Sequence, residues 1–89
     1  MNITYTFCPH CGALTDDRCQ AHPEYPVVTE AHHPDDYATA KQAHAYAEAG
    51  GHSIRSFQVI LHALTISRTE HGAIFRAEPT GLRRVRRVR

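Results

Sequence analysis

The sequence predicts a small α+β domain, and three observations support this fold class. Apolar and polar residues alternate over residues 3–7, which is typical of a strand. Six alanines occur between residues 38 and 49, which favours a helix. The chain has 89 residues, of which 42% are hydrophobic and 21% charged, so it has room for one core and the composition of a folded protein. We therefore expect a single domain.

The first strand leads into a segment with three cysteines. Cys8 and Cys11 are separated by two residues, and so are Cys19 and His22. Two such pairs allow one Zn²⁺ to collect three thiolates and one imidazole in tetrahedral geometry. An odd number of cysteines without an export signal argues against a disulfide framework. We therefore predict a structural zinc site, without an open position for a substrate, at Cys8, Cys11, Cys19 and His22.

The turn Cys-Pro-His-Cys-Gly, residues 8–12, resembles the zinc knuckle of zinc ribbons and rubredoxin-type proteins. The glycine after the second cysteine permits a backbone conformation in which amides point at the sulfurs. The resemblance implies a metal ion that stabilises a small core. The second pair departs from the pattern because it ends in histidine rather than cysteine.

Three alternatives to this zinc site stay open. The turn from Cys8 to Cys11 also resembles the redox turn of thioredoxin-fold disulfide oxidoreductases, although the turn-forming residues 12–17 argue against the helix that follows such a turn. The cysteines could be unliganded core residues instead, although their Pro, Gly and Asp neighbours indicate a surface turn. The fourth ligand could be another histidine, namely His10, His32 or His33.

The next two elements follow from local signals. Residues 27–29 predict a short strand that pairs with the first, so that residues 1–30 form a zinc-binding knuckle region. Pro34 fits the first position of a helix, and the two aspartates after it favour the positive end of the helix dipole. Gly50-Gly51 supplies the stop, which gives a helix of about four turns. This helix opens the second region, residues 34–89, which is helical and ends in a hairpin.

Residues 53–71 fit a helix better than a strand. As a helix, the segment has Ser53 as its N-cap, ends at Gly72 and carries one apolar stripe, formed by Ile54, Phe57, Leu61 and Leu64. As a strand, its β-branched residues would form a hairpin with the segment that follows. We expect one or two helices in the domain, and then a C-terminal hairpin of residues 73–78 and 82–88.

Charge is distributed unevenly along the chain. Residues 1–50 carry two basic and seven acidic side chains, a net charge of −5, whereas residues 51–89 carry eight arginines and two glutamates, a net charge of +6. The basic half ends in an arginine-rich tail. This half therefore favours an anionic partner, and a solvated charged face is the alternative.

Residues 42–61 resemble the helix-turn-helix of bacterial and phage regulators, with small residues in the first helix and Gly50-Gly51 in the turn. One helix precedes the turn, where such domains usually have two. The resemblance implies that the N-terminal turn of the second helix is free to meet DNA bases through Ser53, Arg55, Ser56 and Gln58. It also implies that the hairpin is the wing of a winged helix, with phosphate contacts from Arg83, Arg84, Arg86 and Arg87.

The function predicted from these features is a zinc-stabilised module that binds nucleic acid, DNA rather than RNA, in a regulatory role. The competing hypothesis is a small adaptor or inhibitor that docks on a larger protein or nucleoprotein complex through complementary charge. A helix over residues 53–69 with an exposed Arg55 favours nucleic acid. A continuous sheet that buries residues 57–66 favours the adaptor.

Catalysis and membrane insertion are not expected. The dense cluster from His32 to Asp36 contains no nucleophile and no second metal motif, so we expect its histidines to be exposed in a loop and the protein to have no small-molecule substrate. The longest aliphatic run is residues 59–61, whereas a membrane helix needs about 20 apolar residues. Residues 1–7 lack the basic and then apolar pattern of an export signal, which favours a cytoplasmic location.

Overall fold

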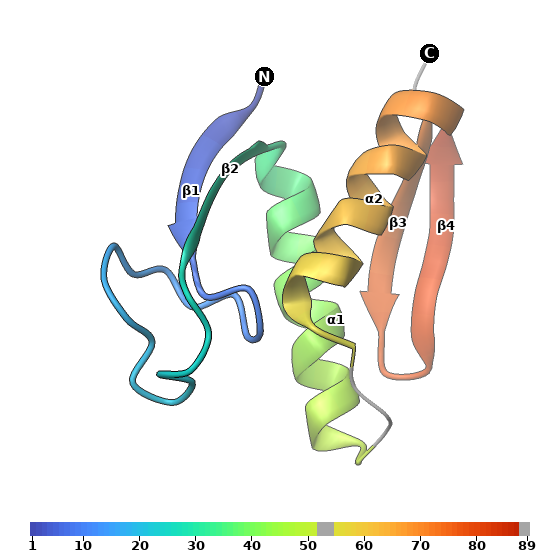
Figure 1. The fold of residues 1–89 in the computed structure, drawn as a ribbon. Coiled ribbons are helices and arrows are strands. Elements are labelled where there is room, and N and C mark those ends of the chain that lie inside the picture. Colours follow the sequence, from blue (N-terminus) through green and yellow to red (C-terminus); the bar gives the residue numbers. More distant parts are fainter. Residues whose placement is uncertain (52–54, 88–89) are drawn as a thin grey trace.

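The computed structural model describes residues 1–51 and 55–87, and it places two helices between two antiparallel hairpins (Figure 1). The predicted α+β class is confirmed, with two helices rather than one. No helix within these residues has the length and hydropathy to cross a bilayer. The elements in chain order are β1 (Ile3–Phe7), β2 (Val28–His32), α1 (Pro34–Ala49), α2 (Phe57–His71), β3 (Ala73–Glu78) and β4 (Gly81–Arg87).

The N-terminal hairpin confirms the predicted pairing of the first two strands. β1 and β2 are antiparallel, with Ile3 opposite His32 and Phe7 opposite Val28. β2 begins one residue later than expected and continues to His32. Residues 8–27, the metal loop, connect the two strands and contain no helix or strand of their own. Both ends of this long loop are therefore held together by the last pair of the hairpin.

Helix α1 has the bounds that its local signals predict. Pro34 occupies the first helical position and Gly50 is the C-cap. His33 is the N-cap, and its Nδ1 accepts a hydrogen bond from the Asp35 amide at 3.1 Å. In the same first turn, the buried Asp36 carboxylate accepts hydrogen bonds of 3.0–3.1 Å from Arg68 on α2. This bidentate ion pair joins the two helices.

Helix α2 confirms the helical interpretation of its segment but begins later than predicted. Ser56 is the N-cap, and its Oγ accepts from the Val59 amide at 3.4 Å. The prediction that Ser53 is the N-cap is therefore wrong, and Ser53 and Ile54 themselves lie outside the described residues. At the other end, Gly72 adopts a left-handed conformation with φ +63°, as expected of a helix stop.

The core lies between the N-terminal hairpin and the helices. Phe7 at the end of β1 contacts both helices, with ring centroids 5.7 Å from Tyr37 and 5.5 Å from Phe57. Both contacts are edge-to-face, the geometry that aromatic rings favour. The buried cluster consists of Phe7, Tyr37, Ala40, Phe57, Leu61 and Leu64. The aromatic part of the core therefore lies next to the residue from which the metal loop begins.

The C-terminal hairpin confirms the prediction for residues 73–88 as far as the structure describes it. β3 and β4 are antiparallel, from Glu78 opposite Gly81 to Ala73 opposite Arg87, with an irregularity beside Phe75. Both strands contact α1, and β3 also contacts α2. The hairpin thus covers the side of the helices opposite to β1 and β2 (Figure 1).

We predict that Arg68→Ala lowers the free energy of unfolding by about 3 kcal/mol, because it leaves the buried Asp36 carboxylate without its partner. Arg76→Ala is the matched control. The Arg76 side chain is 62% exposed and pairs with Glu78 at 3.2 Å. Loss of such a surface pair costs less than about 1 kcal/mol. Urea unfolding followed by circular dichroism measures both variants, and equal losses would contradict the role of the helix–helix pair.

Candidate metal centre

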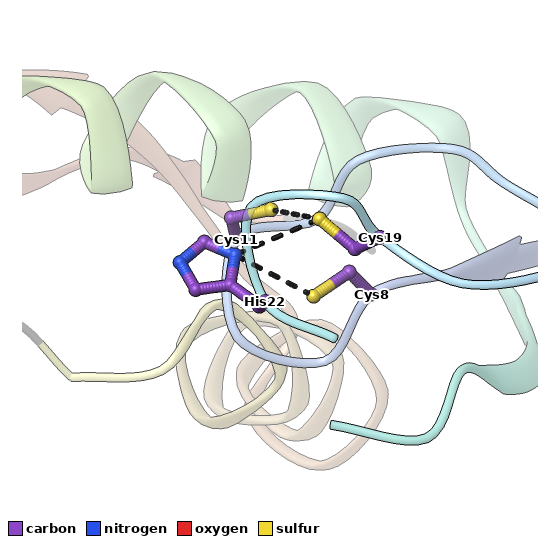
Figure 2. A group of neighbouring side chains, drawn as sticks. All are labelled: Cys8, Cys11, Cys19 and His22. Carbon is purple, nitrogen blue, oxygen red and sulfur yellow. Dashed lines mark hydrogen bonds between the residues drawn. The ribbon is translucent and has the colours of Figure 1, made fainter. Parts of the chain in front are cut away.

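Four side chains of the metal loop converge on one point (Figure 2). Cys8 and Cys11 follow β1 directly, whereas Cys19 and His22 come from the second half of the loop. The Cys11 and Cys19 sulfurs are 3.7 Å apart. Nδ1 of His22 lies 3.6 Å from the Cys19 sulfur and 4.0 Å from the Cys8 sulfur. All four atoms lie within 4.8 Å of one another, so the set is a candidate site for one metal ion.

The other histidines considered as fourth ligands lie elsewhere. His10 stacks on Tyr25, with ring centroids 4.9 Å apart and planes 11° apart. His32 belongs to β2 and bonds to Glu30, and His33 caps α1. Of the four alternatives, only His22 joins the three cysteines in the metal-binding group.

A tight turn brings the first two cysteines together. The Gly12 amide donates to the Cys8 carbonyl at 2.8 Å, and the Cys8 amide donates to the Ala13 carbonyl at 2.9 Å. Gly12 has φ +78°, which side chains rarely adopt, so the turn requires glycine here. The Tyr37 hydroxyl donates to the Gly12 carbonyl and ties the turn to α1. Residues 8–12, called the knuckle from here on, are thus fixed from both sides.

The knuckle also bonds to the start of α2. The Phe57 amide donates to the His10 carbonyl at 2.9 Å, and the Gln58 amide donates to the Pro9 carbonyl at 3.0 Å. The first amides of a helix have no partner within the helix, and here the knuckle carbonyls supply one. The Phe57 ring packs so closely on Gly12 that a Cβ built on the glycine would lie 2.6 Å from it. The metal loop and α2 are therefore in direct contact.

The thiols have different acidities in the absence of a metal ion. Burial raises the pKa of Cys11 to about 11. The hydrogen bond with His22 lowers the pKa of Cys19 to about 7. A bound cation requires the thiolate form at both positions, so metal binding competes with protons mainly at Cys11. The raised pKa also disfavours the redox alternative, which needs a turn that lowers a thiolate pKa at the start of a helix. No helix begins between the knuckle and Pro34.

The residues predicted to read DNA bases are only partly available. Arg55 is exposed and precedes α2, and Ser56 is the N-cap. Gln58 donates to Oε2 of Glu30 at 2.6 Å. The prediction of a free N-terminal turn is wrong, because the knuckle covers the first amides of α2. The connection over residues 50–56 is also longer than the turn of about three or four residues in a helix-turn-helix.

The hairpin arginines lie at the surface where the structure describes them. Arg83 lies opposite Arg76 in the strand register, and its side chain is 66% exposed. Both guanidinium groups approach Glu78, at 3.2 Å from Arg76 and 3.6 Å from Arg83. Arg84 is also exposed. Two further predicted residues belong to β4, but their side chains lie outside the described part of the structure, namely Arg86 and Arg87.

A polar cluster between β2 and α2 was not predicted. His32 is only 4% exposed, so the expectation of an exposed loop histidine is wrong. The strand extends to this residue, and alternation directs Val28, Glu30 and His32 away from solvent. Burial acts to raise the pKa of Glu30, but hydrogen bonds from His32, His62 and Gln58 outweigh it and hold this pKa below its usual value. Alternation continued beyond residue 29 was the signal that could have revealed the cluster.

Comparison of the chain with protein-family models, with curated proteins and with solved structures gives no match. The assignment of the candidate site therefore rests on the positions and chemistry of its four side chains. The same holds for the basic hairpin and for the cluster around Glu30.

We predict that Gly12→Ala destabilises the fold more than Gly51→Ala. Both glycines have left-handed φ angles, +78° and +68°, so both variants carry backbone strain of about 1–2 kcal/mol. Only the first also places a Cβ against the Phe57 ring, which adds about 1–3 kcal/mol of overpacking. The Cβ at Gly51 meets nothing within 4 Å. Denaturant unfolding compares the two, and a larger loss for Gly51→Ala would contradict the knuckle contact.

Proposed function

We propose that the chain is a small zinc-stabilised module that binds nucleic acid through the arginines of the β3–β4 hairpin, in a regulatory and non-enzymatic role. The observation that carries the proposal is the exposed pair Arg76 and Arg83, which face outward from adjacent strands with Arg84 beside them. Guanidinium groups bind phosphate oxygens bidentately, and binding to a phosphate backbone tolerates different base sequences.

Zinc is the metal that suits the cysteine cluster. A tetrahedral ion with Zn–S of about 2.3 Å and Zn–N of about 2.0–2.1 Å holds two sulfurs about 3.8 Å apart, and a sulfur and a nitrogen about 3.6 Å apart. The distances of 3.7 Å from Cys11 to Cys19 and 3.6 Å from Cys19 to His22 match these values. Three thiolates and one imidazole favour Zn²⁺ over cations that prefer oxygen. Four protein ligands leave no open position, so the proposed role is structural.

Zinc would stabilise the domain by fixing a long irregular loop. Residues 8–27 have no helix or strand, and a domain of this size buries little apolar surface. The ion would hold the two halves of the loop together and so keep the knuckle carbonyls in place beneath α2. Metal binding and folding are then coupled, as in other small metal-stabilised domains.

The ion pairs of the hairpin leave its arginines available to phosphate. Arg76 and Arg83 share one carboxylate, Glu78, and both side chains are more than half exposed. Such surface pairs contribute about 0–1 kcal/mol, so a phosphate group can replace Glu78 at little cost. Within the described side chains, the ion pairs of these arginines lie inside the hairpin rather than with the acidic N-terminal half.

The hairpin is a better contact surface than the start of α2. The knuckle covers the first amides of α2, and the Gln58 amide group is bonded to Glu30. Arg55 is exposed, and in Figure 1 the connection between the helices lies at the same end of the molecule as the β3–β4 turn. A base contact from Arg55, and DNA rather than RNA as the ligand, are the finer parts of the proposal.

Zinc binding is tested first by metal content. We expect one zinc per chain by elemental analysis, and loss of cooperative thermal unfolding after chelation at neutral pH. His22→Asn should remove the metal, whereas His10→Asn should retain it, because only His22 directs a ring nitrogen at the sulfurs. A metal-free wild type that stays folded, or a His22→Asn variant with full zinc content, would sink the zinc part of the proposal.

Zinc affinity should rise with pH. Cys11 has a pKa of about 11, so it must release a proton to bind zinc throughout the neutral range, which gives roughly a tenfold gain in affinity per pH unit. Below about pH 7, Cys19 must release a second proton, since its pKa is about 7, and the dependence steepens. Competition with a chelator of known affinity at several pH values measures this slope. A flat profile contradicts thiolate ligation.

Nucleic-acid binding is tested by removing hairpin charge. Replacing Arg83, Arg84, Arg86 and Arg87 with Gln should weaken binding to all sequences alike and flatten the salt dependence by about 0.9 per lost phosphate contact on duplex DNA. Arg18→Gln, an exposed arginine of the metal loop, is the control and should change little. Fluorescence anisotropy with DNA and RNA duplexes and single strands measures each affinity.

The same assay separates the competing hypotheses. If Arg55 contacts a base, Arg55→Ala should cost roughly 1–3 kcal/mol on a preferred site and less on random duplex. Absence of binding to any nucleic acid at low salt would remove the proposal and leave the adaptor or inhibitor hypothesis. A strong effect of Arg18→Gln would move the contact surface away from the hairpin.

A further inference from the structure

A second group of metal-binding side chains lies between β2 and α2, apart from the cysteine cluster. It consists of Glu30, His32 and His62. Nε2 of His32 is 2.8 Å from Oε1 of Glu30, and Nε2 of His62 is 3.0 Å from the same oxygen. The candidate ligand atoms of the three residues all lie within 4.8 Å of one another. Two imidazoles and one carboxylate therefore converge from two elements that are distant in sequence.

Neighbouring side chains orient these donors. Gln58 donates to Oε2 of Glu30 at 2.6 Å, which leaves Oε1 directed at the two histidines. Nδ1 of His32 is 2.8 Å from Oγ1 of Thr65, so the ring is held with its Nε2 toward Glu30. Metal-binding histidines usually have their second nitrogen held in this way, and metal-binding carboxylates are usually hydrogen-bonded as well.

The sequence spacing explains why α2 supplies all three of its contributions. Gln58, His62 and Thr65 are separated by four and three residues, which places them on one face of the helix. Glu30 and His32 alternate on one face of β2. The two faces are packed together, with His32 buried and the His62 side chain 49% exposed. The group thus has one ordered side and one side open to solvent.

We propose that Glu30, His32 and His62 form a second metal site, which binds Zn²⁺ or a similar borderline divalent ion with a coordination position open to solvent. Two imidazoles and a carboxylate suit such ions, and three protein ligands are one fewer than a closed structural site has. The site lacks thiolates, so it binds zinc more weakly than the cysteine cluster does. This inference is independent of nucleic-acid binding.

A small adjustment converts the hydrogen-bonded group into a metal site. A tetrahedral zinc ion with nitrogen and oxygen ligands holds them about 3.3 Å apart, so the contacts of 2.8 Å and 3.0 Å must open by a few tenths of an ångström. The ion takes the place of the Nε2 protons. In His32 the ring proton then resides on Nδ1, from which it donates to Thr65.

The experiment counts zinc ions in the full chain. Protein at micromolar concentration is titrated with Zn²⁺, and binding is followed calorimetrically beside the histidine Cε1–H signals in NMR spectra. We expect one more zinc per wild-type chain than per His62→Asn chain. His71→Asn, an exposed histidine in the last turn of the same helix, is the control and should retain the wild-type count. The count is read as a difference, so it does not depend on occupancy of the cysteine cluster.

A second variant protects the test against misfolding. Glu30→Gln removes the charge but keeps an amide oxygen for the histidines, and we expect it to weaken the additional zinc at least tenfold with unchanged unfolding. His32 and His62 should be the histidines whose NMR signals respond to the additional equivalent. Equal zinc counts in wild type, His62→Asn and Glu30→Gln, or a response confined to other histidines, would overturn the proposal and leave a hydrogen-bonded cluster.

Discussion

Two backbone hydrogen bonds, from the first amides of α2 to the carbonyls of Pro9 and His10, connect the parts of this small domain. They fix where α2 begins, and they place the Phe57 ring against the knuckle and beside Phe7. From this point the core extends along α2 through Leu61 and Leu64. The position of the C-terminal hairpin follows in turn, because β3 starts directly after the glycine that ends α2. Displacement of the knuckle would therefore be transmitted to every later element.

Local signals were sufficient for the features that are local in the chain. The four proposed metal ligands lie within fifteen residues of one another, and the two-residue spacings predict their convergence. Helix α1 carries its own start and stop, Pro34 and Gly50, so its bounds could be predicted without knowledge of the fold. The β3–β4 hairpin has a short turn between its strands, and its prediction also holds.

The features that depend on distant contacts could not be predicted in the same way. The start of α2 is set by carbonyls almost fifty residues earlier, so Ser53 and Ser56 could not be distinguished by local capping preference. The cluster around Glu30 requires β2 and α2 to pack face to face. The charge imbalance between the halves also hides specific pairs, since Asp36 from the acidic half is neutralised by Arg68 from the basic half.

The cap that the knuckle gives to α2 has a consequence for the order of folding. Helix α1 has its cap within its own sequence and can form early, whereas α2 lacks partners for its first amides until residues 8–12 have closed. The local folding of α2 is thus tied to loop closure about fifty residues away, a slower step than the formation of a self-capped helix. In a chain without bound metal, amide exchange should therefore be fastest in the first turn of α2 while α1 retains protection.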